Sequence, residues 1–441
     1  MLVTLHRKAI WAFVALCLVL NLVPVVVFGQ NIHWRISDSP IIVSSTITVE
    51  KGQKLTVDPG VTVRFASGAG LIIDGSILAR GSANDSIRFT VLDATERGSW
   101  GGIVLQGKVN NKETPEGQGE LHNILEYCII EFAGESAFER GAALEVSQSS
   151  ALISNSVIRH CAGDNGIVRV SNMSRVAVRD SRFENNIARI GGGLSLGFGS
   201  RAEIENNMFI NNHSRDNGGA LYLTHSSASI IRNAFIANTS ESHGGAIYAA
   251  VSPDLLIKKN SFYGNKSNFG SNVIFISDKV KADINHNLFE NEGRIVYLEK
   301  AADDINAKNN WCGDPRRFNP VNVIRDRRID NREPSVNTTP ILWMPPEDII
   351  TAPIDIEEII LCRTDNYDTE IPRGVADGSN LRIRLSAKDV NPHYADVIPV
   401  RITSQKDPKG IDFYLKEVTP NTGIFICFNL IRNEDNIRAK V

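Results

Sequence analysis

The sequence predicts an all-β protein in which a long parallel β-helix is followed by a small β-sandwich. The first observation is a phrase that recurs every 26 or 27 residues in the middle of the chain. The second is alternation of apolar residues over short segments separated by Gly and Asn, with no helical periodicity. The third is a change of spacing after residue 354. One repeat of this size cannot bury its apolar face, whereas stacked copies can.

The composition limits the class of protein. The 441 residues include 50 acidic and 47 basic side chains, and hydrophobic residues make up 42% of the chain. This is the hydrophobic content of a folded globular protein. The net charge of −3 argues against a nucleic-acid partner, because a general nucleic-acid binder presents a basic surface. Six Cys are too few for a disulfide-rich scaffold.

Residues 1–29 have the features of a secretory signal peptide. Arg7 and Lys8 precede an apolar segment, and Gly29 fits the small residue before a cleavage site. The alternative is a retained membrane anchor, because the apolar segment approaches the length that spans a bilayer. Pro24 near the small-residue site favours cleavage. We therefore expect a secreted, extracellular or cell-surface protein with no membrane span after cleavage, and the periplasm is the alternative location.

The repeat predicts coils of a β-helix over residues 30–343. The repeated phrase begins at Val157, Phe183, Phe209, Phe235, Phe262 and Phe289, at spacings of 26, 26, 26, 27 and 27 residues. Two positions earlier stand Asn155, Ser181, Asn207, Asn233, Asn260 and Asn287. The large apolar residues are expected to stack inside, with neighbouring strands about 4.8 Å apart. The Asn residues are expected at turns, where they bond one another in a ladder between coils. This structural role explains their recurrence without a bound ligand.

These motifs resemble known proteins. The Phe-x-x-Asn and Gly-Gly-Ala-Ile phrases are similar to right-handed parallel β-helix proteins, including the passenger repeats of bacterial polymorphic outer membrane proteins and β-helix regions related to pectate lyases. Ile47–Phe65 and Ser99–Ile103 resemble the opening coils of secreted bacterial β-helices, and Asn309–Pro315 resembles their closing segment. The resemblance implies a right-handed single-stranded helix. It implies no single activity, because this fold carries many.

The remaining segments have other compositions. Residues 107–119 interrupt the repeat and are expected to form a projecting polar loop. The Arg- and Pro-rich segment after Gly313 is expected to close the open end of the helix, where strand edges would otherwise invite aggregation. Acidic residues interleave with its Arg residues, which disfavours a nucleic-acid patch. Residues 344–353 are expected to form a linker.

Residues 354–441 predict an immunoglobulin-like β-sandwich, because short strands are separated by Asp, Asn, Gly and Pro. Glu417–Phe425 resembles a motif of secreted bacterial β-sandwich modules. Cys362 and Cys427 fall in the first and last predicted strands, and in an oxidising compartment we expect a disulfide between them. Two reduced core thiols are the alternative. No disulfide is expected among Cys128, Cys161 and Cys312, which do not occupy equivalent coil positions.

Most catalytic motifs are absent from the sequence. Gly193–Gly197 matches Gly-x-Ser-x-Gly, but no helix follows it as that motif requires. Asp303 and Asp304 lack the neighbouring phrases of β-helix polygalacturonases. No cofactor is expected, and Asp365, Asp368 and Glu370 form a weak Ca²⁺ candidate. A second candidate is the turn cluster of Asp216, Glu241 and His243, which combines acid, base and metal-binding groups, although polar turn residues are usually only solvated.

The strand after each Gly turn supplies the main candidate for binding. Its alternate residues face the core, so the residue between each pair must face outward. The predicted outward column consists of Glu145, Arg169, Ser195, Tyr222, Tyr248, Phe275 and Tyr297. Four consecutive aromatic residues in it could support sugar rings, and the resemblance implies that this outer sheet is often the ligand face. The alternative is that the aromatic residues only stabilise the sheet or are covered by the 107–119 loop or the tail domain.

Three classes of function follow. The first is a non-catalytic secreted or cell-surface β-helix that binds extended polysaccharide or serves as a structural or adhesive element of the envelope. The alternative is a polysaccharide lyase or glycoside hydrolase that acts on the outer face of the helix through Glu145 and Arg169 or the turn carboxylates. A self-assembling structural protein is a third reading. The expected partner is a polysaccharide or an envelope component, and the oligomeric state stays open.

Overall fold

The computed structural model describes residues 31–342 except 94–95, 107–121, 135–140, 292, 301–303 and 313–318, and, beyond them, seven strands between residues 356 and 432. The predicted signal peptide, projecting loop and linker therefore lie outside the described residues. Among the residues that are described, no helix has the length and apolar character needed to cross a membrane.

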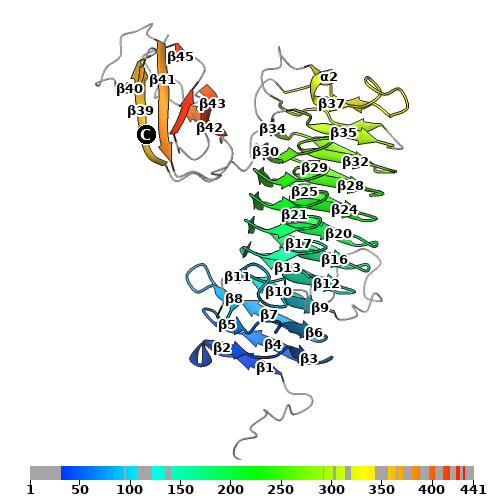
Figure 1. Cartoon of the computed structure of the whole chain (residues 1–441), viewed down its shortest axis with the longest axis vertical. Helices are drawn as coiled ribbons and strands as arrows, with labels where there is room; N and C mark the ends of the chain where they lie inside the picture. Colours follow the sequence, from blue (N-terminus) through cyan, green and yellow to red (C-terminus); the bar gives the residue numbers. More distant parts are fainter. Residues whose placement is uncertain are drawn as a thin grey trace, which may run out of the picture.

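The predicted fold class is confirmed: from Ile32 to Asn337 the chain winds as a parallel β-helix (Figure 1). Three long parallel sheets, here called A, B and C, run along the helix, and each coil up to β35 gives one strand to each sheet. Sheet A contains β1 (Ile32–Trp34), β4 (Lys54–Val57), β7 (Ser76–Arg80), β10 (Asn123–Glu126), β13 (Ser150–Ser154), β17 (Arg175–Arg179), β21 (Arg201–Glu205), β25 (Ser227–Ile231), β29 (Leu255–Lys258), β33 (Ala282–Asn285), β36 (Ile305–Asn306) and β38 (Val336–Asn337).

Sheets B and C follow in each coil. Sheet B contains β2 (Ile41–Val43), β5 (Thr62–Phe65), β8 (Ile87–Val91), β11 (Cys128–Glu131), β14 (Val157–Arg159), β18 (Arg182–Glu184), β22 (Met208–Ile210), β26 (Ala234–Ile236), β30 (Ser261–Tyr263) and β34 (Leu288–Glu290). Sheet C contains β3 (Ile47–Val49), β6 (Leu71–Ile73), β9 (Ile103–Leu105), β12 (Leu144–Ser147), β16 (Val168–Ser171), β20 (Leu194–Leu196), β24 (Leu221–Thr224), β28 (Ile247–Ala250), β32 (Ile274–Ser277), β35 (Val296–Glu299) and β37 (Ile324–Arg325).

Short elements complete the coils. A fourth parallel sheet lies between sheets B and C along the chain, and it consists of β15 (Ala162–Gly163), β19 (Ile187–Ala188), β23 (His213–Ser214), β27 (Thr239–Ser240) and β31 (Lys266–Ser267). A 3-10 turn, η1 (Ile36–Asp38), belongs to the first coil. Near the last coil lies the single-turn helix α2 (Pro320–Val323), where the Asn319 side chain accepts a hydrogen bond from the amide of Val321.

The core is a stack of aromatic and aliphatic side chains along the helix axis. Sheet B strands point Phe183, Phe209, Phe235, Phe262 and Phe289 inward, and successive ring centroids lie 4.8, 5.1, 4.9 and 4.9 Å apart. These rings are between 0% and 4% exposed. The equal spacing of the repeated phrase therefore places the same side chain at the same depth in each coil.

The predicted alignment of the first copy is wrong by one residue. Ile158, not Val157, pairs with Phe183, while Val157 pairs with Arg182. Asn155 occupies the left-handed turn between sheets A and B, at φ 49°, as Asp180 does one coil later at φ 50°. Ser156 is therefore the true counterpart of Ser181, and its amide donates to the Ser181 hydroxyl at 3.1 Å. The structural repeat from Ile158 to Phe183 is therefore 25 residues, because this coil is one residue shorter than the next.

The predicted Asn ladder is confirmed, and it has a parallel companion. One ladder contains Asn207, Asn233, Asn260, Asn287 and Asn310, and the other contains Asn186, Asn212, Asn238 and Asn265. Every Nδ2 except those of Asn265 and Asn310, the last members, donates to the Oδ1 of the next coil at 3.0 Å. All nine Nδ2 groups also donate to a backbone carbonyl. All nine side chains belong to residues that are at most 4% exposed, so the ladders satisfy polar groups that water cannot reach.

Two cysteines stand at the first rung of these ladders. The Cys128 amide donates to the Ser156 hydroxyl and the Cys161 amide to Asn186 Oδ1, both at 3.0 Å. Their positions are not equivalent, because each begins a different ladder. Cys128, Cys161 and Cys312 are free thiols, as the sequence predicts, and burial raises the pKa of Cys161 to about 12.

The strands after residue 355 form one antiparallel network. Its order is β40-β39-β41-β44-β43-β42, with β45 paired to β41. The strands are β39 (Ile356–Arg363), β40 (Asn366–Glu370), β41 (Asn380–Ala387), β42 (Val397–Ile402), β43 (Ile411–Glu417), β44 (Ile424–Cys427) and β45 (Ile431–Arg432). Cys362 lies in β39 and Cys427 in β44, but their side chains lie outside the described part of the chain, as do those of Asp365, Asp368 and Glu370. The sandwich, the disulfide and the Ca²⁺ site stay predictions.

Candidate functional site

The predicted outward column exists as one continuous register line on sheet C. Glu145, Arg169, Ser195, Tyr222, Tyr248, Phe275 and Tyr297 are paired in this order on successive strands, and the line continues to Arg325 on β37. The neighbouring Leu, Ile and Val residues of these strands face the core and are buried. The alternation read from the sequence thus places the column correctly.

The aromatic rings of this column cover one another. Tyr222 and Tyr248 stack with centroids 5.1 Å apart and 3° between planes, and Phe275 follows Tyr248 at 5.3 Å and 6°. Tyr297 continues the stack at 5.0 Å, and the Arg325 guanidinium lies 4.5 Å from the Tyr297 ring centroid. Because each inner ring has neighbours on both faces, a sugar cannot lie flat on these faces as the sequence-based hypothesis required.

Phe275 is also covered from outside, which corrects its place in the predicted ligand-binding face. It is only 1% exposed. The His243 ring lies 4.3 Å from it, and a Cβ on Gly270 would approach its ring to 2.9 Å. Tyr222 and Tyr248 keep more exposure, and burial raises the pKa of the Tyr248 hydroxyl to about 12. The column therefore presents ring edges and hydroxyl groups.

Glu145 and Arg169, the acidic and basic residues that begin the column, lie close together in the structure. Glu145 Oε1 lies 3.6 Å from Arg169 Nη1, and the two side chains are 13% and 11% exposed. The next residue in the column, Ser195, donates its hydroxyl to the carbonyl of Asn165. No helix follows β20, so the described structure agrees with discounting Ser195 as an activated nucleophile.

The predicted turn cluster is divided among separate partners. Asp216 lies 3.8 Å from Arg189, Glu241 lies 3.2 Å from His213, and His243 bonds Asn217 through its amide and Nδ1. Burial lowers the pKa of His243. Within the described residues, no group of three or more His, Cys, Asp or Glu side chains could hold a metal ion. The three side chains therefore take part in separate polar contacts between neighbouring coils.

A hollow lies on the outer face of sheet A, where the sequence predicted no site. It is a groove of about 940 Å³ that crosses β17, β21, β25, β29, β33 and β36. Its lining includes Arg175, Arg201, Ala202, Glu203, Ser227, Ala228, Ser229, Asp254, Leu255, Leu256, Lys281, Ala282, Asp283, Asp304 and Asn306. Six strands at about 4.8 Å spacing give the groove a length of about 24 Å.

Side-chain length explains the hollow. The outward line Glu203, Ser229, Leu256 and Asp283 runs in register across β21 to β33. Ser227 and Ser229 on β25 are short, while Arg175 on β17 and Arg201 and Glu203 on β21 are long and charged. Neighbouring coils thus present side chains of different length at one register position. The short side chains leave the surface lower at β25 than at the strands with long side chains.

The groove carries both signs of charge. Its lining contains three basic residues and four acidic ones: Arg175, Arg201, Lys281, Glu203, Asp254, Asp283 and Asp304. Glu203 accepts hydrogen bonds from Arg175 at 2.8 Å and from Arg179 at 2.9 Å, and the bond from Arg175 lowers the pKa of its carboxyl. Asp283 accepts a bond from Asn306 Nδ2 at 2.7 Å. Such a wall offers donors and acceptors together and favours no strongly charged ligand.

Comparison with known proteins supports the fold and no particular activity. Residues 165–315 match the family model described as right handed beta helix region. A search of curated proteins finds no match. Because one β-helix scaffold supports unrelated functions, this match does not choose between binding and catalysis.

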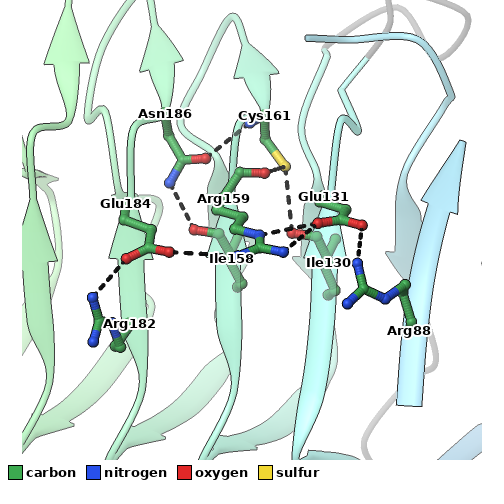
Figure 2. A network of polar contacts seen from close by, with 9 residues as sticks. All are labelled: Arg88, Ile130, Glu131, Ile158, Arg159, Cys161, Arg182, Glu184 and Asn186. Carbon is green, nitrogen blue, oxygen red and sulfur yellow. Dashed lines mark hydrogen bonds and ion pairs between the residues drawn. The ribbon is translucent and has the colours of Figure 1, made fainter. Parts of the chain in front are cut away.

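A charged network lies on the outer face of sheet B, across β8, β11, β14 and β18. Figure 2 shows Glu131 between two arginines: Arg159 donates to Oε2 at 3.0 and 2.9 Å, and Arg88 donates to Oε1. The Glu131 side chain is 6% exposed. Burial alone would raise the pKa of the Glu131 carboxyl, but the bonds from Arg159 and Arg88 outweigh it and lower this pKa below its usual value.

Glu131→Gln is expected to lower the free energy of unfolding at neutral pH by about 1–3 kcal/mol, because charge-assisted hydrogen bonds are lost. A depressed carboxyl pKa adds stability above its unfolded value near 4.3, and this contribution disappears as the pH falls through the folded pKa. The variant should therefore lose less stability than the parent protein between about pH 5 and pH 3. Urea denaturation across this range measures the difference. Glu205→Gln, at an exposed pair 3.5 Å from Arg232, is the control, and equal acid sensitivity of Glu131→Gln and the parent would contradict the assignment.

Proposed function

We propose that this protein is a secreted or cell-surface, non-catalytic β-helix that binds an extended polysaccharide in the sheet A groove. The observation that carries the proposal is the groove itself, which crosses six successive strands without a break in the lining. An elongated groove along a repeating scaffold suits a polymer whose units also repeat. Secretion rests on the features of residues 1–29 in the sequence.

The chemistry of the groove supports a sugar polymer. A sugar hydroxyl both donates and accepts hydrogen bonds, and the groove offers Arg and Lys donors beside carboxylate and hydroxyl acceptors. Leu256, which is half-buried on the outward line of the sheet, adds apolar surface that can contact the C–H faces of sugar rings. The nearly balanced charge of the lining favours a neutral or weakly charged polysaccharide over a polyanion.

Lys281→Ala and Asp283→Ala are each expected to weaken polysaccharide binding about 10-fold or more, because a hydrogen bond to a charged group contributes about 1.5–3 kcal/mol. Ser229→Trp fills the low centre of the groove and should abolish binding. Glycan-array screening identifies the ligand, and titration calorimetry then compares the variants.

Lys258→Ala is the matched control, since Lys258 lies on β29 of the same sheet but does not line the groove. It should bind as the parent protein does. Full binding by Ser229→Trp would contradict the proposal. If binding were lost instead in Tyr222→Ala plus Tyr248→Ala, the ligand face would be sheet C.

A second candidate function, a polysaccharide lyase or hydrolase, rests on the shielded Glu145–Arg169 pair, which Ser195 separates from Tyr222 along the column. If the protein is such an enzyme, Glu145→Gln should reduce the release of unsaturated or reducing sugars about 10²–10⁴-fold, the usual contribution of a general acid or base. Glu126→Gln, at a carboxylate 2.7 Å from Arg80 on sheet A, should leave the rate unchanged. Release of no sugar from a panel of acidic and neutral polysaccharides by the parent protein would reject this candidate.

A further inference from the structure

Two exposed apolar side chains stand at one corner of the helix, between sheets C and A. Met173 lies in the turn between β16 and β17, and Phe198 lies in the corresponding turn between β20 and β21. Their side chains are 70% and 66% exposed. The amide of Met173 donates to the carbonyl of Phe198 at 2.9 Å, so the two turns are direct neighbours. We call Met173 and Phe198 the corner platform.

Neither packing nor backbone geometry explains a large apolar residue at this corner. Phe198 has φ 53°, in the left-handed region that suits Gly, Asn or Asp and is unfavourable for a bulky side chain. The equivalent positions in the neighbouring coils hold the polar residues Asn172 and His225. Burial does not offset the unfavourable angle, because most of the Phe198 ring lies in solvent. Backbone strain of this kind is concentrated at positions where the side chain has a function.

The turn that carries Phe198 is held by the coils on both sides. Its carbonyl accepts the bond from Met173, and the next residue, Gly199, donates its amide to the carbonyl of His225 at 2.7 Å. The backbone under the ring is therefore already ordered. A ligand that stacks on the ring does not have to order the turn first, and this lowers the free-energy cost of binding.

The corner platform lies beside the sheet A groove. Arg175 follows Met173 by two residues and Arg201 follows Phe198 by three, and both arginines line the groove. Three residues of extended chain span about 10 Å at most, so the platform stands close to the groove wall and to one side of its long axis. Arg201 is exposed, and its side chain makes no hydrogen bond or ion pair with another residue in the described part of the chain. Its guanidinium is therefore available to a ligand at this corner.

We propose that the corner platform binds a side-branch sugar of the polysaccharide whose main chain lies in the sheet A groove. The apolar C–H face of the branch sugar stacks on the Phe198 ring, Met173 contacts its edge, and Arg201 donates hydrogen bonds to its hydroxyl groups. A main chain that follows the groove passes to one side of the platform, so a branch is the part of the polymer that extends to it. This inference rests on the proposed function and adds that the bound polysaccharide is branched.

Titration calorimetry with matched branched and linear polymers tests the branch site. The probes are galactomannan and arabinoxylan, each beside the linear mannan or xylan left after enzymatic removal of its branches, and any branched polymer that the glycan array identifies joins them with its debranched form. The parent protein should bind the branched member of at least one pair about 2–10-fold more tightly, the usual contribution of one aromatic contact. Phe198→Ala should abolish this preference and leave the affinity for the linear member unchanged, whereas Phe198→Trp should keep the preference.

Phe269→Ala is the matched control, because Phe269 is 64% exposed in a turn between β31 and β32 and does not line the groove. It should bind both members of each pair as the parent protein does. Equal affinity of the parent for both members of every pair, or a preference that survives Phe198→Ala, overturns the branch site.

Two further outcomes separate this site from the groove and from self-association. Binding of linear polymers that Ser229→Trp abolishes, with no preference for branched forms, would keep the groove and remove the branch site, whereas no binding to any glycan on the array would remove the groove function itself. A dimer in analytical ultracentrifugation that Phe198→Ala dissociates would assign the corner platform to a second copy of the chain and overturn the proposal.

Discussion

Asn233→Ala is expected to lower the free energy of unfolding by about 3–5 kcal/mol, because it leaves several buried groups without partners at about 1–3 kcal/mol each. Asn233 Nδ2 donates to the carbonyls of Ile204 and Ile231 and to Asn260 Oδ1. Its Oδ1 accepts from the amide and the side chain of Asn207. Urea denaturation followed by circular dichroism measures the loss.

Two further variants separate the ladder from other effects. Asn233→Asp keeps the acceptor but removes the donors, so it should cost nearly as much as alanine. Asn285→Ala, whose side chain bonds the neighbouring His286, should change stability by less than about 1 kcal/mol. Equal effects of Asn285→Ala and Asn233→Ala would show that the ladder adds nothing special.

Phe235→Ala is expected to cost about 3–5 kcal/mol, the usual range for removing a fully buried aromatic side chain. Its ring is 0% exposed and stacks on Phe209 and Phe262 at 5.1 and 4.9 Å. The closed coils above and below restrict collapse around the missing ring, so a cavity should persist. The same denaturation experiment measures the change.

Phe269→Ala provides the contrast, because that side chain is 64% exposed and its removal should stay within about 0.5 kcal/mol. A loss below about 1 kcal/mol for Phe235→Ala would mean that the coils close the cavity, and it would contradict a rigid stack.

The sequence is sufficient to predict the coils and their contents. Equal spacing places Phe209 under Phe183 and Asn233 under Asn207, and the alternation around Tyr222 gives the outward column its register. The predicted alignment is wrong at Val157 because that coil is one residue shorter. Asn155 also resembles a ladder residue in the sequence, although it occupies the turn. Spacing alone cannot distinguish these two Asn positions, whereas the backbone angle can.

The surface features needed three-dimensional information. Spacing predicts that Tyr248 and Phe275 are neighbours, but not that their rings stack face to face or that the turn at Gly270 covers Phe275. The groove arises from the contrast between Ser229 and the longer side chains on adjacent strands, a pattern visible only after register is known. The outer face of sheet B also had a signal in the sequence, since Ile236 and Tyr263 are apolar beside inward Phe residues. That signal departs from simple alternation of apolar and polar residues, and both side chains are buried.

The Asn ladders also make the coils interchangeable. Every rung donates in the same direction, from Asn207 to Asn233 to Asn260, so each coil presents the same donors to one neighbour and the same acceptor to the other. If one coil were removed or duplicated as a whole, the new neighbours would meet through identical bonds. The length of the molecule can therefore change during evolution in steps of one coil, about 4.8 Å each, without redesign of either end. Duplication of the DNA that encodes one coil would therefore set the length of such a scaffold.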